Sequence, residues 1–99
     1  NGIWERYWDN GQLLVKWLIK DGVTVDGRVD HYNKIGQIYS ISNYKNNEQD
    51  GIQTWYRENG NLEWRVRKKS GKLEGLSEYF DENGNLEYTE MYINDELVT

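Results

Sequence analysis

Few residues in this sequence could supply a nucleophile, an acid–base group or a metal site. His31 is the single histidine and cysteine is absent, so no thiolate and no cluster of imidazoles is available to bind a metal ion. None of the four serines, Ser40, Ser42, Ser70 and Ser77, stands in the sharp strand-to-helix turn that exposes a catalytic hydroxyl. We therefore predict neither a metal site nor a serine nucleophile.

Paired carboxylates are the remaining source of chemistry, because glycosidases use two at a defined separation. Glu58 and Glu82 occupy equivalent positions of repeated turns, as does Asp9, and Glu63 and Glu87 occupy equivalent positions of repeated strands. Acid–base catalysis needs two carboxyl groups in different environments, whereas repetition gives them similar ones. We predict no catalytic residue, no cofactor and no enzyme activity.

These residues are positioned by four copies of one unit. Each copy has a first glycine, an aromatic residue five positions later, a second glycine nine positions later and an aliphatic residue six positions beyond the aromatic. In chain order these are Gly2, Tyr7, Gly11 and Leu13; Gly27, Tyr32, Gly36 and Ile38; Gly51, Tyr56, Gly60 and Leu62; and Gly75, Phe80, Gly84 and Leu86. We place the repeats at about 2–26, 27–50, 51–74 and 75–99, in a single domain spanning 1–99.

Each unit is predicted to run strand, turn, strand, turn. The turns inside the hairpins are Asp9-Asn10-Gly11, Lys34-Ile35-Gly36, Glu58-Asn59-Gly60 and Glu82-Asn83-Gly84, and the connecting turns are Asp21-Gly22, Asn46-Asn47, Ser70-Gly71 and Asn94-Asp95. Asn-Gly fits a tight turn with both residues at positive φ, and a type I turn closed by a left-handed glycine fits equally well. Alanine and proline are absent and 14% of residues are aromatic, which favours strands. The predicted fold is all-β, an antiparallel meander of four β-hairpins in an elongated, twisted sheet.

Alternation along the strands assigns side chains to two faces. Residues 61–68 place Leu62, Trp64 and Val66 together, and we expect the repeated aromatics (Tyr7, Tyr32, Tyr56 and Phe80) on the same, buried side. The opposite face then carries Trp4, Arg6, Trp8, His31, Tyr39, Trp55, Arg65, Arg67 and Tyr79. Aromatic residues with arginine are typical of binding hot spots, and variable positions build the binding surface of repeat proteins. The variable position, Arg6, His31, Trp55 and Tyr79, is our first candidate for partner binding, followed by Trp4, Trp8, Arg65 and Arg67. Alternatively, a second layer or another copy covers this face.

The repeated pattern G-x-x-x-x-[YF]-x-x-N-G-x-L resembles the MORN-repeat variant, which characterises the bacterial group called YwqK-type antitoxins. The resemblance extends from Gly2 to about Val98, and the second copy departs from it at Ile35 and Asn47. It implies stacked hairpins, a role in protein interaction or in proposed membrane contact, and no established enzyme activity for the repeat.

The charge differs between the last two copies. The fourth repeat holds seven acidic residues and no lysine or arginine, whereas the third holds six basic and three acidic residues. We expect strand 61–69 to lie beside strand 72–80, so that opposite charges pair across the ladder, with Arg67 opposite Glu74. Alternatively, the acidic fourth repeat is a solubilising cap or a docking face for a basic partner. The net charge of −5 argues against nucleic acid and against an anionic membrane as partners.

We predict a non-catalytic protein–protein interaction or scaffolding module, with an antitoxin role as one instance of it. The alternative is a surface that binds carbohydrate or a membrane through exposed Trp and Tyr. Exposed edge strands would favour self-association. We find neither a secretory signal nor a transmembrane segment in this sequence, and its localisation is unknown. Because it opens at a repeat boundary, we expect that it belongs to a longer array.

Overall fold

The chain folds into one antiparallel β-sheet. The computed structural model describes residues 2–20 and 24–99, and this part of the chain forms a 12-stranded sheet without a helix. The strands are β1 (Gly2–Tyr7), β2 (Leu13–Lys20), β3 (Thr24–Val25), β4 (Gly27–Tyr32), β5 (Ile38–Lys45), β6 (Glu48–Gln49), β7 (Gly51–Tyr56), β8 (Leu62–Lys69), β9 (Lys72–Leu73), β10 (Gly75–Phe80), β11 (Leu86–Ile93) and β12 (Glu96–Leu97). The predicted all-β fold is confirmed.

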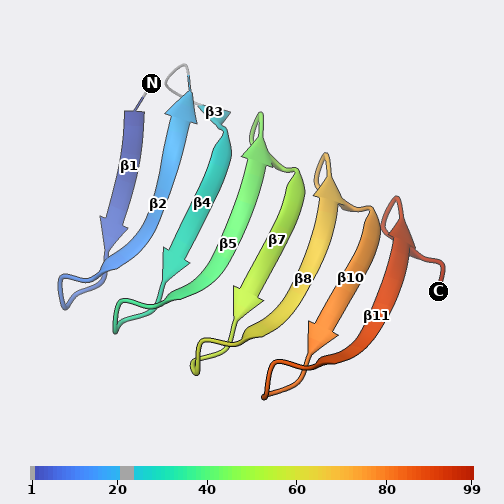
Figure 1. Cartoon of the computed structure of the whole chain (residues 1–99). Helices are drawn as coiled ribbons and strands as arrows, with labels where there is room; N and C mark the ends of the chain where they lie inside the picture. Colours follow the sequence, from blue (N-terminus) through green and yellow to red (C-terminus); the bar gives the residue numbers. More distant parts are fainter. Residues whose placement is uncertain (1, 21–23) are drawn as a thin grey trace.

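The long strands follow one another across the sheet in chain order (Figure 1). Each repeat contributes one long hairpin, namely β1–β2, β4–β5, β7–β8 and β10–β11. The short strands β3, β6, β9 and β12 each pair back onto the long strand that precedes them. The extents along the principal axes are 40 × 32 × 14 Å, and all the described strands belong to the same sheet. The predicted hairpin meander is therefore present, and no second layer from the described residues covers either face.

The turns inside the hairpins are type I turns closed by a glycine. In the first repeat Gly11 N–H donates to the Trp8 carbonyl at 2.9 Å, and Trp8 N–H donates to the Gln12 carbonyl at 2.7 Å. Gly11 has φ +88°, whereas Asn10 is not among the residues with positive φ. Only the glycine needs the left-handed region, which explains why Ile35 is tolerated in the second repeat at the place of Asn10.

The connecting turns are of the other kind, with two consecutive residues at positive φ. Asn46 and Asn47 have φ values of +52° and +72°, and Ser70-Gly71 and Asn94-Asp95 repeat this geometry. Asparagine tolerates the left-handed region, so Asn47 can replace a glycine there without changing the turn. The predicted turn Asp21-Gly22 lies outside the described residues.

A β-bulge interrupts the alternation of side chains in every long hairpin. In the third repeat Trp55 lies opposite Trp64, but Tyr56 lies opposite Leu62, so Glu63 is an extra residue. The same shift in the other hairpins leaves Leu14, Tyr39 and Glu87 as extra residues. The bulge therefore places Leu62 and Trp64 on different faces of the sheet.

The predicted assignment of side chains to faces is thus wrong in part. Tyr56 and Leu62 share a face as predicted, but Trp64 and Val66 lie on the other face, with Trp55. Counting by twos through residues 61–68 fails because the bulged residue Glu63 adds a position without a partner on the facing strand.

We call the two sides of the sheet the aromatic face and the opposite face. The aromatic face carries Trp4, Arg6, Val15, Trp17, Val29, His31, Ser40, Ser42, Gln53, Trp55, Trp64, Val66, Ser77, Tyr79, Tyr88 and Glu90. The opposite face includes Ile3, Tyr7, Leu13, Leu18, Tyr32, Ile38, Ile52, Tyr56, Leu62, Arg65, Arg67, Leu76, Glu78, Phe80 and Leu86. In the described part of the chain every buried residue lies on the aromatic face: Val15, Val29, Ser40, Ser42, Gln53, Val66 and Ser77.

Gln53 joins the second repeat to the third. Its side chain is fully buried, with an exposed fraction of 0%. The Asn43 N–H donates to Gln53 Oε1 at 3.1 Å, and Gln53 Nε2 donates to the Asn43 carbonyl at 3.1 Å. The side-chain amide thus replaces a peptide unit between β5 and β7, which share only the pairs Ser40–Trp55 and Ile41–Thr54.

Carboxylates fasten neighbouring repeats at the connecting turns. Each acidic residue that precedes the first glycine of a repeat accepts a backbone N–H from the next connecting turn. The pairs are Asp26 with Asn46 at 3.3 Å, Asp50 with Ser70 at 3.1 Å, and Glu74 with Asn94 at 2.8 Å. These acidic side chains therefore have a structural role.

The third and fourth repeats lie side by side as predicted, but among the described residues the ion pair between their strands joins Arg65 and Glu78 and not the predicted Arg67 and Glu74. Strand β8 lies beside β10, and Arg65 Nη2 lies 2.8 Å from Glu78 Oε1 on the opposite face. The Glu74 N–H donates to the Arg67 carbonyl at 3.0 Å, which is the register predicted from the Ser70-Gly71 turn. The charge contrast between these repeats thus contributes in part to the ladder itself.

Candidate functional site

The four residues of the variable position lie in one continuous row on the aromatic face. Within hairpins, Arg6 pairs with Val15, His31 with Ser40, Trp55 with Trp64, and Tyr79 with Tyr88. Between hairpins, Val15 pairs with His31, Ser40 with Trp55, and Trp64 with Tyr79. We call the resulting line the central row; it runs Arg6, Val15, His31, Ser40, Trp55, Trp64, Tyr79, Tyr88.

The second half of the central row is a ladder of stacked rings. The ring centroids of Trp55 and Trp64 are 4.0 Å apart, those of Trp64 and Tyr79 6.1 Å, and those of Tyr79 and Tyr88 4.4 Å. The interplanar angles are 12°, 4° and 15°, so neighbouring rings turn their faces toward each other. Among the described residues Tyr88 is the last ring of the ladder, and it is 51% exposed.

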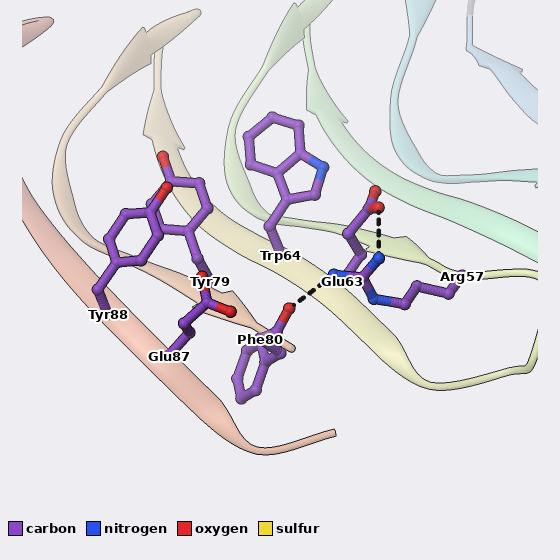
Figure 2. A pocket seen from close by; sticks show the side chains of 7 residues that line it. All are labelled: Arg57, Glu63, Trp64, Tyr79, Phe80, Glu87 and Tyr88. Atoms are coloured by element: carbon purple, nitrogen blue, oxygen red, sulfur yellow. Dashed lines mark hydrogen bonds and ion pairs between the residues drawn. The ribbon is translucent and has the colours of Figure 1, made fainter. Parts of the chain in front are cut away.

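A shallow pocket of about 470 Å³ opens where the ladder meets the hairpin end of the third and fourth repeats. We call it the tyrosine pocket; it is lined by Arg57, Glu63, Trp64, Tyr79, Phe80, Glu87 and Tyr88. Figure 2 shows the stacked rings of Tyr79 and Tyr88 on one side, and Trp64, Glu63 and Arg57 on the other. In this view the carboxylate of Glu87 lies below Tyr79, on the same side of the pocket as the two tyrosines. The pocket therefore combines aromatic walls with charged groups.

Arg57 is held in place within the chain. Its Nη2 donates to the Phe80 carbonyl at 2.8 Å, and its Nη1 lies 3.4 Å from Glu63 Oε2 (Figure 2). Glu87 is exposed, and among the described residues no cation lies within ion-pair distance of it. With Arg57 and Glu63 paired, the charge left over in the tyrosine pocket is negative.

Tyr79 enters the site as a neutral hydroxyl. Its partial burial and the hydrogen bond between its side chain and Glu90 raise the pKa of Tyr79 well above its ordinary value. Tyr92 also donates to Glu90 Oε1, at 3.2 Å. The Glu90 carboxylate therefore lies beside both tyrosines on the aromatic face.

His31 occupies the middle of the central row beside Tyr39, with ring centroids 5.9 Å apart. Burial lowers the pKa of His31 below 6.5, and the nearby carboxylate of Asp30 opposes this shift. Its Nδ1 is buried without a hydrogen-bond partner. His31 is therefore neutral at pH 7, and it contributes a ring rather than a charge to the row.

The other predicted binding residues lie apart from the tyrosine pocket. Trp4 is on the aromatic face near the first edge, where it stacks on Trp17 at 6.4 Å. Trp8 donates its indole N–H to the Tyr32 carbonyl at 2.9 Å, which fastens the first repeat to the second. Arg65 and Arg67 lie on the opposite face. The structure thus divides the predicted set between two faces and the hairpin end.

Sequence reasoning missed Trp64, Tyr88 and Glu87. The alternation along the strand predicts Trp64 in the core, and neither Tyr88 nor Glu87 is among the predicted binding residues. The signal was present, because Trp64 and Tyr88 hold the same repeat position as Val15 and Ser40, the hairpin partners of Arg6 and His31. Recognising it required the position of the bulge.

Over residues 2–20 and 24–99, the structure contains no group of three or more His, Cys, Asp or Glu side chains placed to hold a metal ion. In the same ranges, no helix has the length and apolar character to cross a membrane.

The fold and the repeated turns define a protein built from stacked β-hairpins. The family model described as the MORN repeat variant matches residues 1–21, 49–63 and 70–94, which is more than half of the chain. The chain therefore belongs to the MORN repeat variant family. No curated protein matches this sequence. The matches leave out residues 22–48, where the second repeat departs from the pattern at Ile35 and Asn47.

Proposed function

We propose that this protein is a non-catalytic protein–protein interaction or scaffolding module that binds its partner through the aromatic face. The family supports the general role, because MORN repeats are often binding or scaffolding modules and are generally non-catalytic. The observation that carries the proposal is the central row, in which the variable position of successive repeats places one exposed and three half-exposed side chains on one face.

The exposed apolar area supports the same function. Only Val15, Val29 and Val66 are buried hydrophobic residues in the described chain, whereas Trp4 and Tyr88 on the aromatic face are 56% and 51% exposed. Extended apolar patches on a soluble fold are typical of interaction sites. A single-layer sheet therefore suits a partner that supplies the missing layer.

The arrangement of the rings favours a protein over a sugar as ligand. Sugars stack on the free faces of aromatic rings, but the ladder rings face one another at 4.0 to 6.1 Å. A carbohydrate would find free faces only at the ends of the ladder. Carbohydrate is the second candidate, because carboxylates that could bind sugar hydroxyls, those of Glu63 and Glu87, line the same pocket as Trp64. Membrane binding is disfavoured, because the acidic fourth repeat would repel anionic headgroups.

An antitoxin role is one form that such a module could take. In that case the partner is a protein toxin, and binding would block its active surface. This part of the proposal rests on the resemblance to YwqK-type antitoxins. It is tested by asking whether a captured partner inhibits growth when expressed alone and loses this effect when expressed together with this chain.

The direct test is capture of partners from a lysate of the source organism. The wild type is compared with Trp55→Ala/Tyr79→Ala, which removes two rings of the ladder, and with Arg65→Ala/Arg67→Ala on the opposite face. A specific protein retained by the wild type and the arginine variant, but lost with the ladder variant, is the expected result. Tyr88→Ala provides a second ladder variant at an exposed position, in case the double variant unfolds. Glycan and liposome screens complete the test, and ligands found only there would contradict a protein partner.

A further inference from the structure

The third and fourth repeats use equivalent positions of the tyrosine pocket differently. Glu63 and Glu87 are both the bulged residues of their hairpins. The residue that follows the repeated aromatic is Arg57 in the third repeat and Asp81 in the fourth. The third repeat therefore supplies its own guanidinium to its bulged glutamate, and the fourth repeat has a carboxylate at the corresponding place.

Asp81 performs a different task. Its Oδ1 accepts the backbone N–H groups of Asn83 and Asn85, each at 2.9 Å, and these bonds lower the pKa of Asp81. The side chain is thus committed to the hairpin turn as an anion. It cannot balance the charge of Glu87, and it adds a second negative charge at the same end of β11.

Glu87 therefore lacks the partner that Glu63 has, while the groups needed to hold such a partner are present. A guanidinium binds a carboxylate and also stacks on aromatic rings. Tyr88 follows Glu87 directly, lines the same pocket and is 51% exposed. The Arg57–Glu63 pair, with Arg57 also bound to the Phe80 carbonyl, shows within this chain how the bulged glutamate receives a guanidinium.

We propose that the tyrosine pocket binds an arginine side chain from a basic segment of the partner protein, with Glu87 as the anionic anchor and Tyr88 as the stacking surface. This proposal rests on the proposed function and adds the chemistry of the partner. The seven acidic residues of the fourth repeat, with no lysine or arginine among them, would attract such a segment from a distance. Arginine is preferred to lysine because its planar fork can bind the carboxylate and stack at the same time.

The test uses a defined probe rather than an unknown partner. An octapeptide of alternating glycine and arginine is titrated into the isotope-labelled chain, and amide NMR shifts are followed. A matched peptide carries citrulline, which keeps the shape of arginine without its charge. We expect saturable shifts centred on Tyr79, Glu87 and Tyr88 with the arginine peptide, and at most weak shifts with citrulline.

Two glutamate variants separate the pocket from general electrostatics. Glu87→Gln should weaken binding about tenfold, the loss expected for one charge-assisted hydrogen bond. Glu96→Gln makes the same charge change at an exposed position of β12, directly after the connecting turn Asn94-Asp95 and at the other end of β11 from Glu87. It should change the affinity by less than about twofold. Both positions are exposed, so both variants should fold.

Three results would overturn the proposal: equal binding of the citrulline peptide, equal loss in both glutamate variants, or shifts that centre outside the tyrosine pocket. These results test the arginine pocket and leave the proposed function to the capture experiment. A lysate partner that still requires the ladder, together with no binding of the arginine peptide, would retain the interaction module and remove the arginine pocket.

Discussion

The aromatic face and the opposite face bury neighbouring residues to very different extents. Gln53 and Ser77 on the aromatic face are 0% and 1% exposed, whereas the adjacent Ile52 and Leu76 on the opposite face are 40% and 44% exposed. Polar side chains are thus buried beside exposed aliphatic ones. Burial in this single layer follows the position on the sheet rather than hydrophobicity.

The large rings of the central row explain this difference. Gln53 and Ser77 each lie two residues before a ring of the ladder, Trp55 and Tyr79, on the same face. Only small residues, or a residue whose polar groups are fully paired, can occupy such a space. The opposite face has ion pairs and separate apolar side chains instead. We therefore expect the stability of the fold to depend mainly on the aromatic face.

The largest effect is expected for Gln53→Leu, which keeps the volume but removes the amide. The Asn43 N–H would lose its acceptor in a buried place, so unfolding should become easier by about 3 kcal/mol. Urea denaturation measures this change. Ile52→Ala, one position away on the opposite face, is the control and should cost less than about 1 kcal/mol. Similar losses of unfolding free energy in the two variants would show that the two faces contribute equally to stability.

Trp64→Ala should have the next largest effect, because Trp64 lies between Trp55 and Tyr79 in the ladder. Loss of two stacking partners and of partly buried area should cost about 2 kcal/mol. Leu86→Ala, 54% exposed on the opposite face, should cost less than about 1 kcal/mol. Thermal unfolding followed by tryptophan fluorescence and circular dichroism compares the two. A larger loss for Leu86→Ala would reverse the assignment of stability to the aromatic face.

The Arg65–Glu78 ion pair tests how much the opposite face contributes to the stability of the fold. Its side chains are 40% and 23% exposed, so solvent screens the 2.8 Å contact. A double-mutant cycle with Arg65→Ala and Glu78→Ala should give a coupling free energy of about 0.5 kcal/mol. High salt should reduce this value. A coupling above about 2 kcal/mol would mean that the opposite face contributes as much as the ladder.

The smallest effect concerns pH. Burial lowers the pKa of His31 in the folded state below its ordinary value of 6.5, so the unfolded chain binds the proton more readily. The stability from neutral His31 is therefore fully present above about pH 6.5 and is lost as pH falls through the folded pKa. His31→Gln should lose less stability than the wild type between pH 7 and pH 5. Parallel curves for the two proteins would show that the ring is not desolvated.

Much of the architecture could be predicted from the sequence because the turns are encoded locally. Gly11 and its equivalents, and asparagine at Asn46-Asn47, mark the positions that require positive φ. The pairing of β8 with β10 was predicted from the Ser70-Gly71 turn, which sets Arg67 opposite Glu74, and from the charge contrast between the third and fourth repeats. The candidate site was predicted only in part, because the bulge at Glu63 moves Trp64 and the residues after it in that strand to the face opposite the predicted one.

The sequence by itself therefore determined the repeat, the turns, the order of the hairpins and the variable row, since each depends on backbone preferences within a few residues. Only the tertiary structure decided which face is buried, how the rings stack and where the tyrosine pocket lies. These features depend on the register across strands and between repeats. A single extra residue such as Glu87 shifts that register without changing the composition of the strand.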